Sequence, residues 1–231
     1  MRTTGSMMTK MKIVICNSKN WFNLNANNES SLTVKLITNQ EDLTKDLLDS
    51  FEPSYVFFVH WSSIVPHEIY TNFECVVFHT APLPYGRGGS PIQNLILEGF
   101  KSSPVCALRM NGELDSGPIY EKREISLDGS LSEIFTRLNY AINKLIKKIT
   151  KGDIIPVEQD GVPHNFKRLT AENNKLASDM NLMQLYDRIR MLDHEDYPNA
   201  FLISGNLKFE FFNVEQDDEF VTVNCRISKC Q

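Results

Sequence analysis

The sequence predicts an α/β fold, a doubly wound and mostly parallel sheet followed by a small β-rich appendage. Short apolar runs of strand length alternate with stretches whose apolar residues recur at helical spacing. The runs are apolar at nearly every position, which is typical of strands that are buried on both faces. After about residue 152 the sequence becomes polar and irregular, and then predicts one helix and two more strands.

The first part of the chain supplies four predicted strands, at residues 12–16, 33–37, 55–59 and 75–78. Between the second and third strands, Asn39 is predicted to cap a helix, and Pro53 follows the end of that helix. The apolar face of this helix consists of Leu43, Leu47, Leu48 and Phe51.

Further along the chain, Ser90-Pro91 predicts a helix start, because a proline at the first helical position gives up no hydrogen bond. Two strands are predicted at residues 105–108 and 119–125. The strongest helix pattern runs from Ser130 to Thr150. It starts with a capping box of Ser130 and Glu133 and continues as an apolar stripe.

The last part of the chain predicts an irregular segment at residues 154–168 and a helix at 179–192. Two strands follow at 207–212 and 220–227, with a turn at 216–219 between them. We therefore expect a disordered lead-in at residues 1–11, a main α/β domain at 12–170, and a helix-plus-β subdomain at 171–231.

The composition is that of a soluble globular protein, with 42% hydrophobic and 23% charged residues. No apolar run reaches the length of a transmembrane helix, so no membrane partner is expected. The net charge of −5 argues against a long contact with a phosphate backbone, and so against a nucleic-acid partner. Five cysteines without a CxxC pair predict buried, reduced thiols, no metal site and a cytoplasmic location.

Several residues that are suited to catalysis or ligand binding lie between Cys75 and Asn94. His79 directly follows a buried strand, at the edge where open α/β sheets bind ligands. The glycines Gly86, Gly88 and Gly89 are expected to let a ligand approach the main chain, since they lack a Cβ atom. The sequence here favours a ligand cleft, although a purely structural role for the histidine stays open.

A second polar cluster, residues 111–117, joins two predicted strands. Its Asp115 lies between turn residues, where a carboxylate can be held at a fixed angle. An aspartate in such a turn also has a purely structural interpretation, because aspartate is a common turn former. The residues alone therefore support a cleft with one histidine and one aspartate.

The motifs His79-Thr-Ala-Pro-Leu-Pro84, Arg87-Gly88 with Pro91, and Asp115-Ser-Gly-Pro-Ile119 together resemble the N10-formyltetrahydrofolate-dependent formyltransferases. The pattern of that family is Asn-x-His-x-Ser-x-Leu-Pro, then Arg-Gly-x-x-Pro, then Asp-x-Gly. The resemblance covers roughly residues 12 to 170. It implies a Rossmann-like formyltransferase fold and N10-formyltetrahydrofolate as the co-substrate.

Two positions depart from the family pattern: Val77 stands where the family has its catalytic asparagine, and Ala81 stands where it has a serine. The stretches GRGGSPIQNLI and RMLDHEDYPNAFL look most like the N-formyltransferases of the pseudaminic acid pathway, which serve bacterial surface glycans. That branch implies a nucleotide-linked amino sugar as acceptor, a UDP-4-amino-4,6-dideoxyhexose, and a monomer or homodimer. The alternatives are a non-catalytic homologue that binds folate or sugar nucleotides, and a methionyl-tRNA formyltransferase.

The resemblance also implies roles for single residues. His79 would donate to the oxyanion, and Asp115 would orient it and take up protons. For the missing amide donor the candidates are Asn94, Gln93 and a water molecule, with Asn94 the first choice because it lies one turn into the helix behind the glycines. The expected folate contacts are Trp61, Arg87, Gly88, Asn111, Leu114 and Asp115, and the expected acceptor contacts are Lys19, Trp21 and Gln93.

Overall fold

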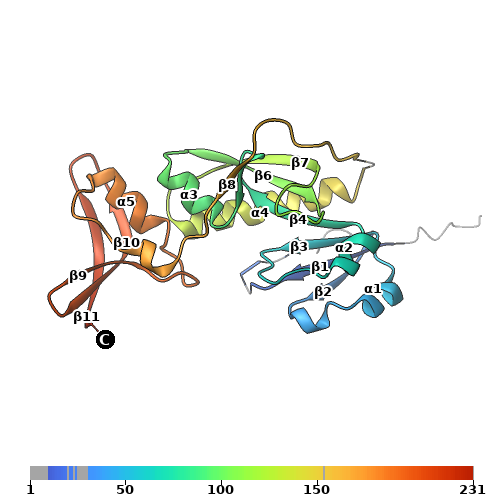
Figure 1. Ribbon diagram of the computed structural model, residues 1–231, viewed down its shortest axis with the longest axis horizontal. Helices are drawn as coiled ribbons and strands as arrows, with labels where there is room; N and C mark the ends of the chain where they lie inside the picture. Colours follow the sequence, from blue (N-terminus) through green and yellow to red (C-terminus); the bar gives the residue numbers. More distant parts are fainter. Residues whose placement is uncertain (1–9, 20, 23, 25–30, 153, 231) are drawn as a thin grey trace, which may run out of the picture. The chain divides into compact units, whose positions relative to one another are not determined.

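The computed structural model describes residues 10–19, 21, 22, 24, 31–152 and 154–230 (Figure 1). The predicted lead-in at residues 1–11 lies outside this part of the chain except for Lys10 and Met11. Within the described ranges, no helix has the length and apolar character that crossing a membrane would need.

Six strands form the main sheet, in the order β2-β1-β3-β4-β6-β7. The pairs β1–β2, β1–β3 and β3–β4 are parallel. The bounds are β1 Met11–Asn17, β2 Leu32–Ile37, β3 Tyr55–Val59, β4 Cys75–Thr80, β6 Ser102–Arg109 and β7 Ile119–Ser126. A separate antiparallel sheet has the order β11-β10-β9, with β9 at Ala200–Ser204, β10 at Leu207–Gln216 and β11 at Val221–Lys229. The predicted fold class, a mostly parallel α/β sheet with a β-rich appendage, is confirmed.

Internal contacts divide the chain into two compact units. The first unit comprises Met1–His79, Cys106–Arg123 and Asn139–Asp160. The second unit comprises Thr80–Val105, Glu124–Leu138 and Gly161–Gln231. This division differs from a single cut along the sequence, and the predicted boundary at residues 170 and 171 stays a prediction.

The first unit owes its core to the apolar runs of β1, β3 and β4. Because successive side chains of a strand point to opposite faces, each run buries residues on both sides of the sheet. The helices α1 (Lys45–Phe51) and α2 (His67–Asn72) contribute Leu48 and Ile69 to this core. The cluster on one face consists of Val14, Cys16, Ile37, Leu43, Leu48, Val56, Phe58, Ile69 and Cys75.

The helix after β2 begins later than predicted. A 3-10 turn occupies Gln40–Asp42, and α1 then starts at Lys45. The Oγ1 atom of Thr44 accepts a hydrogen bond from Leu47 N at 3.2 Å, whereas Asn39 contacts Asp42. The predicted cap at Asn39 is wrong, because asparagine and threonine both cap helices well and the chain uses the one that directly precedes the helix.

The second unit contains α3 (Pro91–Leu97), α5 (Leu182–Arg190) and a pair of strands that the sequence analysis did not predict. These strands are β5 (Tyr85–Gly88) and β8 (His164–Phe166), which pair in parallel. The 3-10 turn at Ala171–Asn174 was also not predicted. Asn181 caps α5 by accepting a hydrogen bond from Gln184 N at 2.9 Å. The helix is shorter at both ends than the predicted range 179–192.

All five cysteines are free thiols. Cys16, Cys75 and Cys106 are buried as predicted, whereas Cys225 and Cys230 are exposed. Burial raises the pKa of the Cys75 thiol to about 12, so this thiol stays protonated and unreactive at neutral pH.

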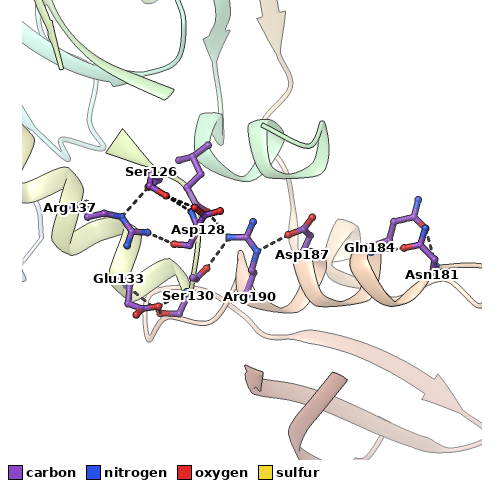
Figure 2. A network of polar contacts seen from close by, with 11 residues as sticks. Ser126, Asp128, Ser130, Glu133, Arg137, Asn181, Gln184, Asp187 and Arg190 are labelled. Carbon is purple, nitrogen blue, oxygen red and sulfur yellow. Dashed lines mark hydrogen bonds and ion pairs between the residues drawn. The ribbon is translucent and has the colours of Figure 1, made fainter. Parts of the chain in front are cut away.

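Figure 2 shows the polar network that joins the start of α4 (Leu131–Ile149) to the end of α5. The predicted capping box is present, because Ser130 N donates to Glu133 Oε2 at 2.8 Å and Glu133 N donates to Ser130 Oγ at 3.3 Å. Arg190 is only 3% exposed, and its Nε donates to Asp187 Oδ1 at 2.6 Å. Its Nη1 donates to the carbonyl oxygens of Leu127 and Gly129 at 2.6 and 2.8 Å, so the arginine fastens the turn before α4 to α5.

We expect Arg190→Met to lower the free energy of unfolding by about 3–5 kcal/mol, since it leaves the buried Asp187 carboxylate without its cation. Urea unfolding followed by circular dichroism measures the change. The control Lys45→Met removes an exposed pair with Asp49 and should leave the unfolding midpoint nearly unchanged. Equal midpoints for Arg190→Met and the wild type would contradict the importance of the network.

Candidate active site

His79 and Asp115 form a buried pair in the first unit. The side chains are 7% and 10% exposed, and His79 Nδ1 lies 3.3 Å from Asp115 Oδ2. His79 comes from the end of β4, and Asp115 comes from the loop between β6 and β7. The structure therefore brings together the two residues that the sequence motifs singled out, although they are far apart in the chain.

The backbone of Asp115 is in the left-handed region, with φ at 51°. Few residues other than glycine adopt this conformation, and aspartate and asparagine do so more readily than most. Asn111 shapes the same loop, since its Oδ1 accepts from Glu113 N and from Ser116 Oγ, both at 3.0 Å. Leu114, in contrast, is 75% exposed. The predicted contacts of Asn111 and Leu114 with folate stay predictions.

Gln159 is a residue of the candidate site that the sequence analysis missed. Its Nε2 donates to the main-chain oxygens of Asp115 and Gly117, at 2.8 and 2.9 Å. Val157, two residues earlier, pairs with Ile119 at the start of β7, which brings the segment beside the loop. A glutamine in a polar, irregular stretch has no sequence feature that marks it as part of a site. Only the pairing of Val157 with Ile119 would have indicated that Gln159 lies beside the Asp115 loop.

Val77 has apolar surroundings. It lies on β4 and packs, partly buried, against the core cluster of the first unit. Its side chain can donate no hydrogen bond, so the position has lost the amide that the family pattern places there. The surrounding core also favours an apolar residue, because an amide placed here would need a hydrogen-bond partner.

Trp61 follows β3 and is partly buried. Its ring packs edge-on against Phe58, with ring centroids 6.1 Å apart. Its indole Nε1 is buried and has no hydrogen-bond partner among the described residues. A buried N–H group usually has a partner, so this donor is suited to an acceptor atom of a bound molecule.

The glycines after β4 allow the protein's own segments to approach one another closely. A Cβ atom on Gly88, which has φ at 101°, would lie 2.7 Å from the carbonyl oxygen of Phe166. A Cβ atom on Gly89 would lie 2.5 Å from the Cβ of Arg168. The main chain of this loop is therefore approached closely by the protein's own segment around β8. The expectation that these glycines make room for a ligand stays a prediction, as do the ligand contacts of Arg87 and Gly88.

Asn94 and Gln93 lie on α3 in the second unit. Asn94 Nδ2 donates to the carbonyl oxygens of Gly89 and Ser90 at 3.0 Å and of Lys167 at 3.1 Å. Gln93 is 3% exposed, and its Nε2 lies 3.5 Å from the carbonyl oxygen of Met191. These contacts give both residues a structural task, whereas their predicted roles toward the oxyanion and the acceptor stay untested.

Replacing Asn94 by alanine should lower the free energy of unfolding by about 1–3 kcal/mol, because three carbonyl oxygens lose their shared donor. Urea denaturation measures this change. Asn72→Ala is the matched control, since Asn72 donates to Glu68 O from an exposed position. If both variants unfolded at the wild-type midpoint, the contacts of Asn94 would not be stabilising.

Comparisons with known proteins connect this geometry to a family. Residues 2–149 match the family described as formyl transferase. Residues 171–228 match the C-terminal domain of methionyl-tRNA formyltransferase. Methionyl-tRNA formyltransferase of Campylobacter lari is 29% identical over 197 residues, which are 82% of this chain and 63% of that protein. The chain spans less than two thirds of the length of the curated relatives it matches.

Solved structures show the same fold. A structure described as methionyl-tRNA formyltransferase from Clostridium thermocellum matches with a TM-score of 0.90 and 37% identity, over 95% of this chain and 99% of that chain. HypX from Aquifex aeolicus, solved in complex with tetrahydrofolic acid, matches with a TM-score of 0.72 and 17% identity. That match covers 91% of this chain and 39% of that chain, and it shows the fold alone.

These comparisons overturn the expected acceptor. The curated relatives are methionyl-tRNA formyltransferases, so the amino-sugar acceptor and the exclusion of a nucleic-acid partner are both wrong. Sugar N-formyltransferases are also among the similar structures, but at 18% identity or less, which shows only the shared fold. The pseudaminic acid branch finds no support.

The expected family, in contrast, is confirmed. The matched residues 2–149 make up more than half of the 231 residues, and they include both His79 and Asp115. N10-formyltetrahydrofolate, the formyl donor expected from the motifs, is the donor of this family. The chain belongs to the formyl transferase family.

Proposed function

We propose that this protein transfers the formyl group of N10-formyltetrahydrofolate to the amine of methionyl-tRNA. The observation that carries the proposal is the buried contact between His79 and Asp115, two residues of the family motifs whose side chains are suited to act as an acid–base pair. The acceptor follows from the curated relatives and from the match of residues 171–228. A tRNA acceptor also makes the cytoplasm the expected location.

The residues of the first unit fit a folate by their chemistry. The loop before β7 offers main-chain N–H and C=O groups, which suit the hydrogen-bonding edge of a pterin ring. Leu114 is exposed on that loop, and an exposed leucine can cover an apolar ring face. Trp61 adds a buried indole N–H without a partner among the described residues, and such a donor would hold a polar atom of the folate.

N10-formyltetrahydrofolate supplies the carbon that the amine attacks, and its N10 is the leaving group. The amine gives up one proton, and N10 takes up one, so the protein must move a proton between two nitrogens. When both ring nitrogens of His79 carry a proton, Nδ1 faces Asp115 and Nε2 can donate to the formyl oxygen. A donor directed at developing negative charge lowers the barrier by about 3–4 kcal/mol.

Asp115 completes this scheme in two ways. Its carboxylate holds the imidazole in one orientation, and it can accept the proton that the amine releases. Both groups are almost fully buried, so little water competes for their hydrogen bonds. The proton then returns to N10 through the same pair, which leaves His79 and Asp115 as they were at the start.

The charge distribution limits how the protein can contact a tRNA. Residues 171–231 contain eleven Asp and Glu but only six Lys and Arg, whereas residues 1–170 contain eighteen of each. The excess of negative charge lies entirely in the C-terminal segment, which is therefore a poor surface for a phosphate backbone. The proposal implies that phosphate contacts come mainly from residues 1–170 and that tRNA binding weakens only gently with added salt.

The proposal is tested by incubating the purified protein with N10-formyltetrahydrofolate and initiator methionyl-tRNA. We expect formyl-methionyl-tRNA, detected after mild hydrolysis of the ester, and an equal amount of tetrahydrofolate. A protein that binds tetrahydrofolate in calorimetry but formylates no methionyl-tRNA would contradict the acceptor. Turnover of any kind excludes the non-catalytic homologue considered from the sequence.

His79→Asn and Asp115→Asn should each lower kcat roughly 100-fold or more, because the two groups act mainly on the transition state. Binding of tetrahydrofolate should persist in both variants, as measured by calorimetry. His67→Asn is the matched control, since His67 is exposed on α2 and should tolerate the change. A variant at position 79 or 115 with most of its activity would remove that residue from the mechanism.

Gln159→Met keeps the size of the side chain but removes its two donated hydrogen bonds. We expect kcat to fall roughly 10-fold, since the Asp115 loop loses the contacts that fix its angle. The KM for methionyl-tRNA should change little, and Gln159→Asn should not restore the rate because its amide is one methylene shorter. Wild-type kcat in Gln159→Met would show that the loop holds its shape without this residue.

A further inference from the structure

A group of aromatic and amide side chains lies at the carboxyl ends of β1 and β3, and the proposed chemistry at His79 does not use it. β1 pairs with β2 on one side and with β3 on the other, so the chain reverses its direction of travel across the sheet at β1 (Figure 1). In open α/β sheets, such a reversal marks the crevice in which ligands bind. Trp21 and Phe22 follow β1, and His60 directly follows β3.

The rings of Trp21 and His60 are in direct contact. Their centroids lie 4.3 Å apart with an angle of 46° between the planes, and Phe22 meets His60 edge-on at 5.9 Å. Phe22 is only 5% exposed, so it belongs to the core beneath the pair. Trp21 and His60, in contrast, are each only partly buried.

Asn139 of α4 fixes this arrangement. Its Nδ2 donates to the main-chain oxygen of Trp21 at 3.4 Å, so its Oδ1 is the atom that faces His60. The distance from His60 Nε2 to Asn139 Oδ1 is 3.2 Å, which makes Nε2 the donor and sets the orientation of the imidazole ring. One amide therefore ties the loop after β1 to the residue after β3.

The backbone gives independent support to the pair. His60 has φ at 49°, a conformation that few residues other than glycine adopt. Holding a histidine there is unfavourable, and residues in such conformations cluster at functional sites. Asn17 at the end of β1 also fixes its loop, since it accepts from Lys19 N at 3.0 Å and donates to Lys19 O at 2.6 Å. Several contacts therefore hold the two rings in one position.

We propose that Trp21 and His60 form the stacking face for a nucleobase, the terminal adenine of the acceptor end of tRNA. Partly exposed aromatic rings that are held rigidly stack on unpaired bases, and single-stranded ends are the part of an RNA in which bases are free to do so. Lys19, two residues before Trp21 in the chain, carries a positive charge that suits a nearby phosphate. This inference rests on the proposed function, because it assigns the acceptor of that reaction to the β1–β3 crevice.

Two tryptophans are present in the whole chain, so Trp61→Phe leaves Trp21 as the sole indole fluorophore. In this variant we expect the trinucleotide CCA and AMP to quench the fluorescence of Trp21 in a saturable manner. Ribose 5-phosphate and methionine amide lack a base and should leave the signal unchanged. This measurement needs neither folate nor turnover, so it stays separate from the test of the proposed function.

Substitutions then test the stacking face in the otherwise wild-type protein. Trp21→Ala and His60→Gly should each weaken the binding of CCA roughly 10-fold or more, and they should raise the KM for methionyl-tRNA without a matching loss of kcat. Glycine is chosen at position 60 because it adopts a positive φ without strain, so the fold should survive the loss of the ring. His67→Ala, on α2, is the matched control.

The possible outcomes separate the two proposals. Quenching by CCA and AMP supports the stacking face even if methionyl-tRNA is not formylated, a result that removes the proposed acceptor alone. Formylation with a wild-type KM by both Trp21→Ala and His60→Gly overturns the stacking face and leaves the proposed function standing. An absence of quenching in a Trp61→Phe variant with wild-type circular dichroism also overturns the stacking face.

Discussion

The site depends on one constraint: the loop before β7 must hold the Asp115 carboxylate against His79 while its backbone adopts a positive φ. That conformation is unfavourable by on the order of 1 kcal/mol, so the surrounding structure has to impose it. The two ends of the loop meet where Arg109 N donates to Pro118 O at 2.8 Å. Gly117 allows this closure, because a Cβ atom there would lie 1.8 Å from the carbonyl oxygen of Arg109. Gln159 then holds the middle of the loop, and the carboxylate is positioned before any substrate binds.

The parts of the fold that the sequence predicted are those set by local pattern. β1, β3, β4 and α4 follow from apolar runs and from a capping box, signals that lie within a few residues of each other. The pair of β5 and β8 could not be predicted, since a strand reading YGRG has no apolar alternation and exists only because residues 164–166 lie beside it. The same reason hid Gln159 and Asn139, whose partners lie 44 and 118 residues away in the sequence. The pairing of His79 with Asp115 was predicted through the family motif and not through any local rule.

The acceptor was misjudged for a related reason. The motifs around His79 and Asp115 identify the family and its formyl donor, so they carry little information about the acceptor. The net charge of −5 was taken as an argument against nucleic acid, but it is an average over a neutral segment and an acidic one. An end-on contact with the last nucleotides of a tRNA needs few phosphates, and such a contact is compatible with residues 1–170. The inference from total charge excludes only a long backbone contact.

Val77 affects which side chains of the candidate site are able to donate a hydrogen bond to the formyl oxygen in the proposed reaction. With no amide at this position, the proposed reaction needs its donors to the formyl oxygen from other groups, among them His79. Since Val77 also packs against the core of the first unit, its position contributes to the stability of β4, the strand that carries His79. An asparagine here would gain a hydrogen-bonding group at the expense of apolar packing, and β4 would lose apolar contact close to His79. In the proposed reaction, this departure from the family pattern leaves more to the orientation of one imidazole ring, and hence to the loop that holds Asp115 against it.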